Sequence, residues 1–423
     1  MINDNHNLRR RDLLKGAGYF ATGLALSQLA SCTPQEPATE ENTNTDTSTD
    51  TKAGTNSAAN QEPVKIGLVA ALTGESALSG EAISRGLSVA MEEVNAAGGV
   101  LGGRPLALVS RDDESDPAKG VVVARELIEQ EKVAVVFGGL DSPVSLAMLP
   151  VFHELTTPYM GVWAAATNIT QNDFKPNYAF RVSANDHLVD KFLLQHAKDK
   201  YQVSKVGLIL INNPWGESNQ KGFEEWSKKI GIQIAGIEKF NEEDTDVTPQ
   251  LTRLKNSGAE ALMLVANAAP AAQVMRSLTR INWEVPIISH WGISGGRFPE
   301  LAGDIANKVE FMQTYSFFAA QSPTGQKVLQ ALDQQFQLKD PSEILAPVGT
   351  ANAYDGLMLT AKAIEQAGST EGAKLQATFE NLPQYKGLIK TYEKPFTTDN
   401  HDALTEDDYI MVRWEDHKIV PVK

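Results

Sequence analysis

The chain has 423 residues but a single cysteine, Cys32. No disulfide can therefore form within the chain, and the folded body has no thiol for catalysis. Basic residues are also scarce, because 38 Lys and Arg stand against 53 Asp and Glu and give a net charge of −15. Without a basic stripe, nucleic acid is not expected as a partner.

Nucleotide and metal motifs are absent as well. No Walker-type or G-x-G-x-x-G sequence lies between an expected strand and an expected helix, and the glycine pairs at 98–99 and 102–103 come after a helix instead. The seven histidines are scattered without the spacing of metal ligands. We therefore expect no cofactor and no metal.

Long apolar runs are also missing, and the N-terminus carries only a short one. Residues 16–30 are mildly apolar and follow the basic run Arg9-Arg10-Arg11, which is typical of a secretory signal and too short for a membrane span. The run 10–15 also resembles the twin-arginine export motif, with Arg9 where that motif usually has Ser or Thr. Twin-arginine and general secretory export both remain open.

The position of the cysteine indicates a lipid anchor. Leu29-Ala30-Ser31-Cys32 resembles the lipobox of bacterial lipoproteins, in which cleavage precedes a cysteine that is then lipidated. We expect residues 1–31 to be the signal peptide and residues 32–62 to be the lipidated Cys32 and a tether. From residue 33 to residue 62 no aromatic or branched aliphatic residue occurs, so this segment has nothing to bury. The inner or outer membrane of a bacterium would hold the anchor.

From Pro63 onward, short apolar runs alternate with helical patterns. The first expected strands are 64–70, 106–111 and 133–137, and the first helices are 81–97 and 117–130. The alternation starts again near Asn185, with strands at 205–211, 233–240, 261–266 and 285–289. Strands that alternate with helices of this length predict βαβ units with parallel sheets, and therefore an α/β chain with two doubly wound lobes.

Small polar residues follow two neighbouring strands of the first half. Gly138 and Gly139 end one strand, Ser142 is predicted as the N-cap of the next helix, and Pro143 fits its first turn. The strand at 158–162 ends in a similar way, in Trp163-Ala164-Ala165-Ala166-Thr167. A helix N-terminus at the carboxyl edge of an open sheet favours a crevice for a small anionic group.

The chain from Val64 onward resembles the type I periplasmic solute-binding proteins of the branched-chain amino acid and amide transport family. The resemblance is carried, in family order, by segments such as VKIGLVAALTGESALSGEAISRGLSVAMEEVNAAGG, VAVVFGGLDSPVS, AAATNIT, NPWGESNQKGF and DTDVTPQLTRLKNSGAEALMLV. It implies two Rossmann-like lobes joined by three crossovers near Ser183, Tyr315 and Lys390. Lobe 1 would comprise 63–183 plus 316–389, and lobe 2 would comprise 184–315 plus 390–423.

The resemblance also assigns candidate ligand-binding residues. In members that bind amino acids, a serine after the third strand and an Ala-Ala-Thr segment hold the ligand carboxylate, and an aromatic residue of the second lobe packs on the ligand. The matching positions are Ser142, Ala165, Ala166, Thr167 and Trp215. Trp291, Ser79 and Asn267 complete the candidate site.

Two departures from the family pattern bear on the ligand. Trp291 stands where members have an acidic residue that pairs with the ligand's ammonium, and Asn267-Ala268 stands where a tyrosine often lines the pocket. With Trp163, Trp215 and Trp291 available and no evident counter-charge for ammonium, an aromatic or apolar carboxylate, or an amide, fits better than leucine. Asp141 would repel an anion unless it points away.

These observations predict an exported, monomeric, lipid-anchored protein that captures a small organic solute and delivers it to the permease and ATPase of an ABC importer. A ligand sensor that docks to a receptor is an alternative, because it would use the same hinge. A serine hydrolase is a further alternative, because Gly292-Ile293-Ser294-Gly295-Gly296 matches the nucleophile-elbow pattern, with Asp304 and either His401 or His417 downstream. Gly295, Gly296 and Pro299 make a poor helix start after Ser294, which disfavours the hydrolase.

Overall fold

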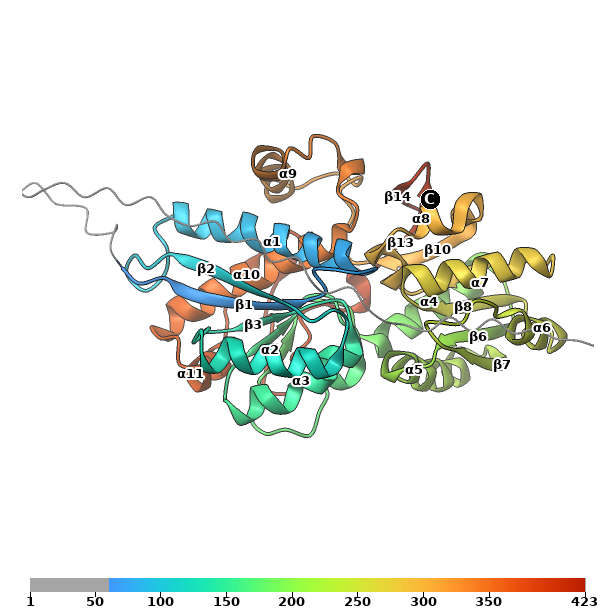
Figure 1. The fold of residues 1–423 in the computed structure, drawn as a ribbon, viewed down its shortest axis with the longest axis horizontal. Helices are drawn as coiled ribbons and strands as arrows, with labels where there is room; N and C mark the ends of the chain where they lie inside the picture. Colours follow the sequence, from blue (N-terminus) through green and yellow to red (C-terminus); the bar gives the residue numbers. More distant parts are fainter. Residues whose placement is uncertain (1–60, 423) are drawn as a thin grey trace, which may run out of the picture. The chain divides into compact units, whose positions relative to one another are not determined.

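The computed structural model describes residues 61–422 (Figure 1). The predicted signal peptide, the lipidated Cys32 and nearly all of the tether lie outside these residues. Within the described part of the chain, every helix is too short or too polar to cross a membrane.

Lobe 1 is built on a five-stranded parallel sheet with the strand order β2-β1-β3-β4-β5. β1, β3, β4 and β5 are short, mostly apolar runs that are almost fully buried, as is typical of parallel sheets covered by helices, whereas the edge strand β2 is only partly buried. Their bounds are β1 Val64–Ala70, β2 Leu106–Asp112, β3 Val136–Gly138, β4 Tyr159–Gly161 and β5 Ala179–Arg181.

Helices cover both faces of this sheet. α1 packs along α10 on one face, and α2 packs along α3 on the other (Figure 1). α9 contacts α1, and α11 contacts α10, so the late helices return to lobe 1. The bounds are α1 Ala77–Ala96, α2 Pro117–Glu129, α3 Ser142–Glu154, α9 Pro323–Phe336, α10 Pro347–Ala367 and α11 Gly372–Phe379.

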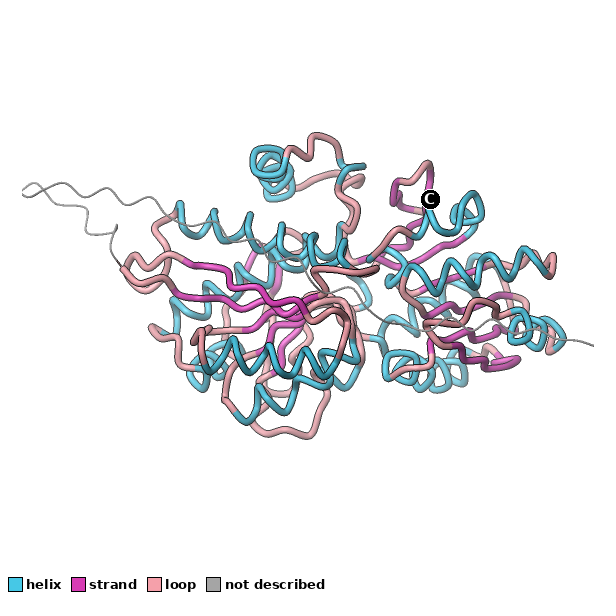
Figure 2. Tube along the Cα trace, in the orientation of Figure 1, coloured by secondary structure: helices cyan, strands magenta, loops and turns pink. Residues whose placement is uncertain are grey.

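Lobe 2 is built on a seven-stranded mixed sheet with the order β14-β13-β10-β9-β8-β6-β7. The strands from β6 to β10 are parallel, whereas β13 and β14 add an antiparallel edge. Figure 2 shows the strands in magenta among the cyan helices. Their bounds are β6 Lys205–Ile211, β7 Gln233–Phe240, β8 Ala261–Val265, β9 Ile287–Ser289, β10 Val309–Gln313, β13 Ile410–Glu415 and β14 Lys418–Pro421.

The helices of lobe 2 also form two layers. α4 packs against α5, while α7 packs against α6 and α8. α5 carries a polar N-cap, Asn213, whose side chain accepts hydrogen bonds from Trp215 N and Gly216 N. The bounds are α4 Asp186–Tyr201, α5 Pro214–Ile230, α6 Thr248–Asn256, α7 Ala268–Arg280 and α8 Phe298–Ala302.

Three crossovers connect the lobes. The chain leaves lobe 1 after β5, returns after β10, and leaves it again towards β13. The segment after the short β11–β12 hairpin (Tyr385–Lys386 and Thr391–Tyr392) stays beside lobe 1, because Asp402 forms a parallel bridge with Arg181 of β5. The third crossover therefore lies after Asp402, later than the expected position near Lys390.

The predicted α/β class with two doubly wound lobes is confirmed. One local prediction is wrong, because the N-cap of α3 is Asp141, and Ser142 is the first residue of the helix. The hydroxyl of Ser142 is thereby free to act outside the helix that it begins.

Candidate functional site

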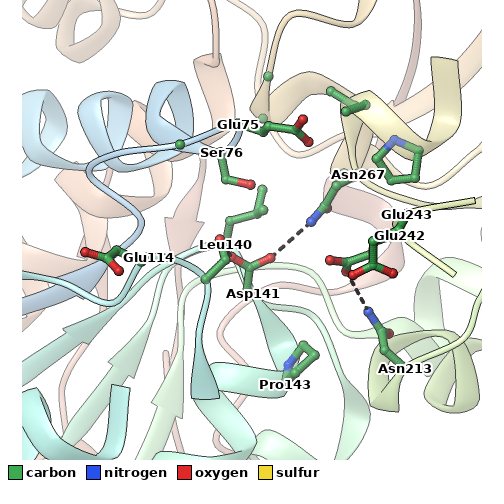
Figure 3. A pocket seen from close by; sticks show the side chains of 18 of the residues that line it. Glu75, Ser76, Glu114, Leu140, Asp141, Pro143, Asn213, Glu242, Glu243 and Asn267 are labelled. Carbon is green, nitrogen blue, oxygen red and sulfur yellow. Dashed lines mark hydrogen bonds between the residues drawn. The ribbon is translucent and has the colours of Figure 1, made fainter. Parts of the chain in front are cut away.

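Loops that follow the strands of both lobes surround one cleft of about 570 Å³ (Figure 3). Lobe 1 contributes residues after β1, β2 and β3, and lobe 2 contributes residues after β6, β7, β8 and β9. Because the carboxyl ends of parallel strands meet at one edge of a sheet, each lobe presents a row of loops to the cleft. A cleft of this size suits a small organic molecule.

Carboxylates dominate the charge of the cleft. Its lining holds five of them and no Lys, Arg or His: Glu75, Glu114, Asp141, Glu242 and Glu243. Among the described residues, only Glu114 of these five has a nearby cation, since Lys119 Nζ lies 2.5 Å from its Oε1. The cleft is therefore a region of negative potential.

The titration of nearby groups responds to this potential. Desolvation, followed by the charge of Asp141, raises the pKa of Glu242. Burial, followed by the charges of Asp141 and Asp112, raises the pKa of Asp113 to about 7. Since like charges raise the pKa of a carboxyl group, a cation in the cleft would lower these pKa values again.

Asp141 lies at the centre of the cleft and joins the two lobes. Its Oδ1 accepts a hydrogen bond from Asn267 Nδ2 at 3.0 Å (Figure 3). Its Oδ2 accepts one from Ser115 Oγ at 2.7 Å. Burial raises the pKa of Asp141. Its carboxyl group lies in the lining of the cleft between Asn267 and Ser115, and in its ionised form it disfavours a bare anion there.

The predicted residues of lobe 1 lie together behind Asp141. Ser142 Oγ accepts hydrogen bonds from Ala165 N and Ala166 N, both at 3.2 Å. Thr167 N donates to Ser218 Oγ of lobe 2 at 3.0 Å. The backbone N–H groups of the segment 165–167, which the resemblance assigns to binding a ligand carboxylate, are thus paired with protein hydroxyl groups in this conformation.

Tryptophans close the inner end of the cleft. Trp163 and Trp291 are each 1% exposed and meet edge to face, with ring centroids 6.1 Å apart. Together with Trp215 they line a small inner cavity of about 10 Å³, next to Ser142 and Ala165. This volume holds about one water molecule, so the head group of a solute enters the inner cavity only if the lobes part.

Of the two remaining candidate residues, Ser79 lies outside the cleft lining and Asn267 lies in it. Ser79 is fully buried, and its Oγ donates to Ser76 O at 2.6 Å, so it supports the first turn of α1, while Ser76 itself lines the cleft. Asn267 lines the cleft and precedes α7, where it holds Asp141.

Ser294 does not occupy a nucleophile elbow. It lies in a short 3₁₀ helix, Trp291–Gly295, where its Oγ donates to Trp291 O and accepts from Gln313 Nε2. His401 contacts Ala179 O and Glu380 instead. The elbow pattern in the sequence therefore lacks the strand-to-helix geometry that activates a serine.

The acidic lining was not predicted from the sequence. A signal existed, because Glu75, Glu114 and Glu242 each follow an expected strand by two to five residues. Within residues 61–422, no group of three or more His, Cys, Asp or Glu side chains is placed to hold a metal ion.

Comparison with known proteins agrees with this geometry. A sequence model of the family described as periplasmic binding protein matches residues 63–418. The Leu/Ile/Val-binding protein homolog 3 of Brucella melitensis is 26% identical over 370 residues, which cover 86% of this chain and 95% of that protein.

Two solved structures share the fold. The branched-chain amino acid transporter substrate-binding protein LivJ of Streptococcus pneumoniae, in complex with isoleucine, has a TM-score of 0.72 at 22% identity, covering 85% of this chain and 98% of LivJ. The solute-binding protein of an ABC transporter from Rhodopseudomonas palustris, in complex with p-hydroxybenzoic acid, has a TM-score of 0.72 at 20% identity, covering 86% and 96%.

Two α/β lobes, three crossovers and a cleft between strand ends define the fold of the type I periplasmic binding proteins. The chain belongs to the family described as periplasmic binding protein, whose model spans residues 63–418.

Proposed function

We propose that this chain is an exported, lipid-anchored solute-binding protein that captures an amino-acid-like solute and delivers it to the permease and ATPase of an ABC importer. The observation that carries the proposal is the cleft of about 570 Å³ that loops of both lobes line. Relatives that are named as binding proteins for leucine, isoleucine and valine, or as homologues of such proteins, support it.

Closure of the lobes supplies the mechanism. The bonds from Asn267 to Asp141 and from Thr167 N to Ser218 join the lobes, and a solute that contacts both lobes would add to them. The solute thereby favours the closed form, which presents surfaces of both lobes together to the permease. Binding involves no catalytic step, and a monomer suffices for it.

The charge of the cleft narrows the class of solute. A solute whose only charge is a carboxylate would face five carboxylates and no base, whereas an amine would gain from them. Because Trp291 replaces the acidic residue of the family, the sequence predicts no carboxylate to pair with an ammonium group. In the structure, Asp141 and Glu242 can take that role. We therefore favour an amine-bearing carboxylate or amide over an aromatic or apolar acid, with the tryptophans packing on a flat or apolar remainder.

Matched pairs of probes test this class by isothermal titration calorimetry. Leucine is compared with 4-methylpentanoate, and phenylalanine with 3-phenylpropanoate, because each pair differs only in the amine. Leucinamide tests whether an amide head suffices. We expect the amine-bearing member of a pair to bind at least tenfold more tightly, and Glu242→Gln to lower that affinity roughly two- to fivefold.

Three other results would redirect the proposal. Tighter binding of the acids that lack an amine would refute the amine but leave solute capture intact. If no probe binds and small-angle scattering detects no closure with any of them, solute capture itself fails. If a receptor that is not part of a transporter binds only the closed form of the protein, the sensor alternative is favoured.

The anchor is tested separately. We expect Cys32→Ser to move the protein from the membrane fraction to the soluble fraction, because a lipidated cysteine would be the attachment point. Thr33→Ser, next to the cysteine, is the control and should stay with the membrane. Retention of the Cys32→Ser variant on membranes would exclude lipidation at this position.

A further inference from the structure

A buried polar cluster lies behind the tryptophans of lobe 2 and outside the cleft. Asp186 and Asp190 lie one turn apart on α4, and both are fully buried. Trp215 and Asn219 of α5 and His290 after β9 complete the cluster, and each is at least 94% buried. None of these groups is needed to explain the acidic cleft.

Asp186 holds two aromatic side chains at once. Its Oδ1 accepts a hydrogen bond from Trp215 Nε1 at 3.1 Å and lies 3.0 Å from His290 Nε2. Trp291 N donates to His290 Nδ1 at 2.8 Å, so Nδ1 is the acceptor nitrogen of the ring. Nε2 of the neutral ring therefore carries the proton and donates it to Asp186.

The remaining oxygens of the cluster have no donor. Asp186 Oδ2, both carboxyl oxygens of Asp190, and Asn219 Oδ1 are buried without a hydrogen-bond partner among the described residues. Asn219 Nδ2 donates to Trp215 O at 2.9 Å and forms no hydrogen bond with either carboxyl group among the described residues. Two ionised carboxylates at positions i and i+4 in such a site would repel each other at high cost.

One proton resolves this arrangement. Burial, followed by the charge of Asp186, raises the pKa of Asp190 well above its usual value. Within residues 61–422, no Lys or Arg forms an ion pair with either carboxyl group. Among the described elements that pack on this face of α4, His290 is the one titratable partner of the two carboxyl groups. The other neighbours, Trp215, Asn219 and Gly222, are neutral.

The backbone of α5 packs directly against Asp190. A Cβ atom at Gly222 would lie 2.0 Å from Asp190 Oδ2, so α5 seals this side of the cluster. No group of three or more His, Cys, Asp or Glu in the described part of the chain is placed to bind a metal. A proton shared within the cluster is the simplest way to satisfy its acceptors.

We propose that Asp190 is a neutral carboxylic acid that donates to Asp186, and that this pair positions Trp215 and His290–Trp291 as the lobe 2 walls of the solute site. Asp186 reaches both walls through the same oxygen, so a change there alters both together. The tip of Trp215 is fixed further, because a Cβ atom at Gly292 would lie 2.6 Å from its Cη2. The proposal depends on the proposed function only where it says that these walls select the solute.

Infrared spectroscopy tests the proton itself without any solute. We expect the protein at pH 7 to show the C=O stretch of a protonated carboxyl group, and Asp190→Asn to reduce it. Asp113 is a second buried carboxyl group that holds a proton near this pH, so Asp113→Asn is recorded as the control. Absence of a band that depends on Asp190 would overturn the proposal.

Stability as a function of pH gives a second readout. Above the ordinary carboxyl pKa of about 4, the folded protein still holds the proton of Asp190 while the unfolded chain does not, so its stability falls as the pH rises until Asp190 ionises. Asn in place of Asp190 stays neutral and its amide N–H can still donate to Asp186. We therefore expect Asp190→Asn to fold and to remove part of this slope, and an unchanged slope would count against a buried proton.

The positioning role needs variants of Asp186 and Trp215. Asp186→Asn removes the negative charge and one of the two acceptor oxygens, and Trp215→Phe keeps an aromatic ring but removes the indole N–H donor, which isolates one link if Asp186→Asn fails to fold. We expect either variant to change the leucine-to-phenylalanine affinity ratio by about tenfold. Asp186→Asn should also shift the tryptophan emission. A folded variant with unchanged emission and an unchanged affinity ratio would refute the positioning role. If neither leucine nor phenylalanine binds the wild type, the proposed solute class is refuted, whereas the emission and infrared tests still apply.

Discussion

Asn267 Nδ2 donates a hydrogen bond to Asp141 Oδ1 at 3.0 Å and thereby joins lobe 2 to lobe 1 across an otherwise acidic cleft. The amide is suited to this position because it supplies a donor without adding charge. A carboxylate in its place would face Asp141 directly. This hydrogen bond therefore helps to hold the lobes together because Asn267 is neutral and does not repel Asp141.

Replacing Asn267 with aspartate should open the lobes. Repulsion between two carboxylates at hydrogen-bond distance would disfavour the closed form by roughly 1–4 kcal/mol, depending on solvent exposure. Small-angle scattering at pH 8 should show a larger radius of gyration, and lowering the pH to 4 should reverse it. Gln334→Glu, which adds the same charge on the exposed surface of α9, is the control and should leave the radius unchanged. Equal radii for both variants would mean that this contact does not control closure.

Asp113 should make the stability of the protein depend on pH between about 4 and 7. Its pKa is about 7 in the folded chain, mainly because of burial, and about 4 when unfolded. The folded state therefore binds the proton more tightly, and the free energy of unfolding decreases as the pH rises through this range, by about 2–4 kcal/mol. Asp113→Asn should flatten this part of the profile in urea denaturation. A profile that keeps its slope would assign it to other groups.

The strands and helices could be predicted because each depends on local pattern. β1, β6 and β7 have the predicted bounds, since each is a continuous apolar or alternating run between turn residues. The start of α3 was misplaced by one residue because Asp141 and Ser142 are both good N-cap residues, and only the tertiary partners of Ser142 distinguish them. Local sequence thus predicts elements better than their ends.

The site could be predicted only where it follows strand ends. Ser142 lies beside Ala165, two positions predicted for the same site, but Ser218, which accepts from Thr167 N, belongs to the other lobe and was not predicted. Whether Ser142 Oγ faces a ligand or a backbone N–H depends on how far the lobes close, which residue types do not encode. The buried polar cluster around Asp186 combines residues of three elements up to 104 residues apart, so no local sequence motif predicts it.

Thr167→Ala should lower stability more than affinity. In the sequence, this threonine resembles a ligand-binding residue, and a loss of roughly 1–3 kcal/mol in binding would follow if its hydroxyl held the ligand. In the structure, Thr167 Oγ1 accepts a hydrogen bond from His187 N at 3.1 Å and contacts Asn185 Oδ1 at 3.2 Å, at the start of α4. We therefore expect a loss of about 1 kcal/mol in the free energy of unfolding.

Thr167→Ser, which keeps the hydroxyl, is the matched control and should behave as the wild type. Affinity is measured by calorimetry with the tightest probe. If Thr167→Ala lost binding while the free energy of unfolding stayed the same, the hydroxyl would belong to the ligand after the lobes rearrange.

The ion pair between Arg181 and Asp402 should be the most costly contact to break near the crossovers. Both side chains are almost fully buried, with Arg181 Nε 2.6 Å from Asp402 Oδ1. Arg181 also donates from Nη1 to Ala166 O at 2.9 Å and from Nη2 to Thr170 Oγ1 at 2.9 Å, so it holds the loop that carries Thr167. Arg181→Met should lower the free energy of unfolding by about 3–5 kcal/mol, because it leaves a buried carboxylate unpaired.

Removing both charges tests whether the unpaired carboxylate causes this loss. Arg181→Met with Asp402→Leu should cost less than the sum of the single changes, although Asn185 Nδ2 then loses its acceptor on Asp402. Arg280→Met, which breaks the exposed pair with Asp246, is the control and should cost less than about 1 kcal/mol. Additive single costs in urea denaturation would show that the two residues act separately. A double variant more stable than either single one would instead show that the unpaired charge, and not the lost packing, is what destabilises the loop beside the cleft.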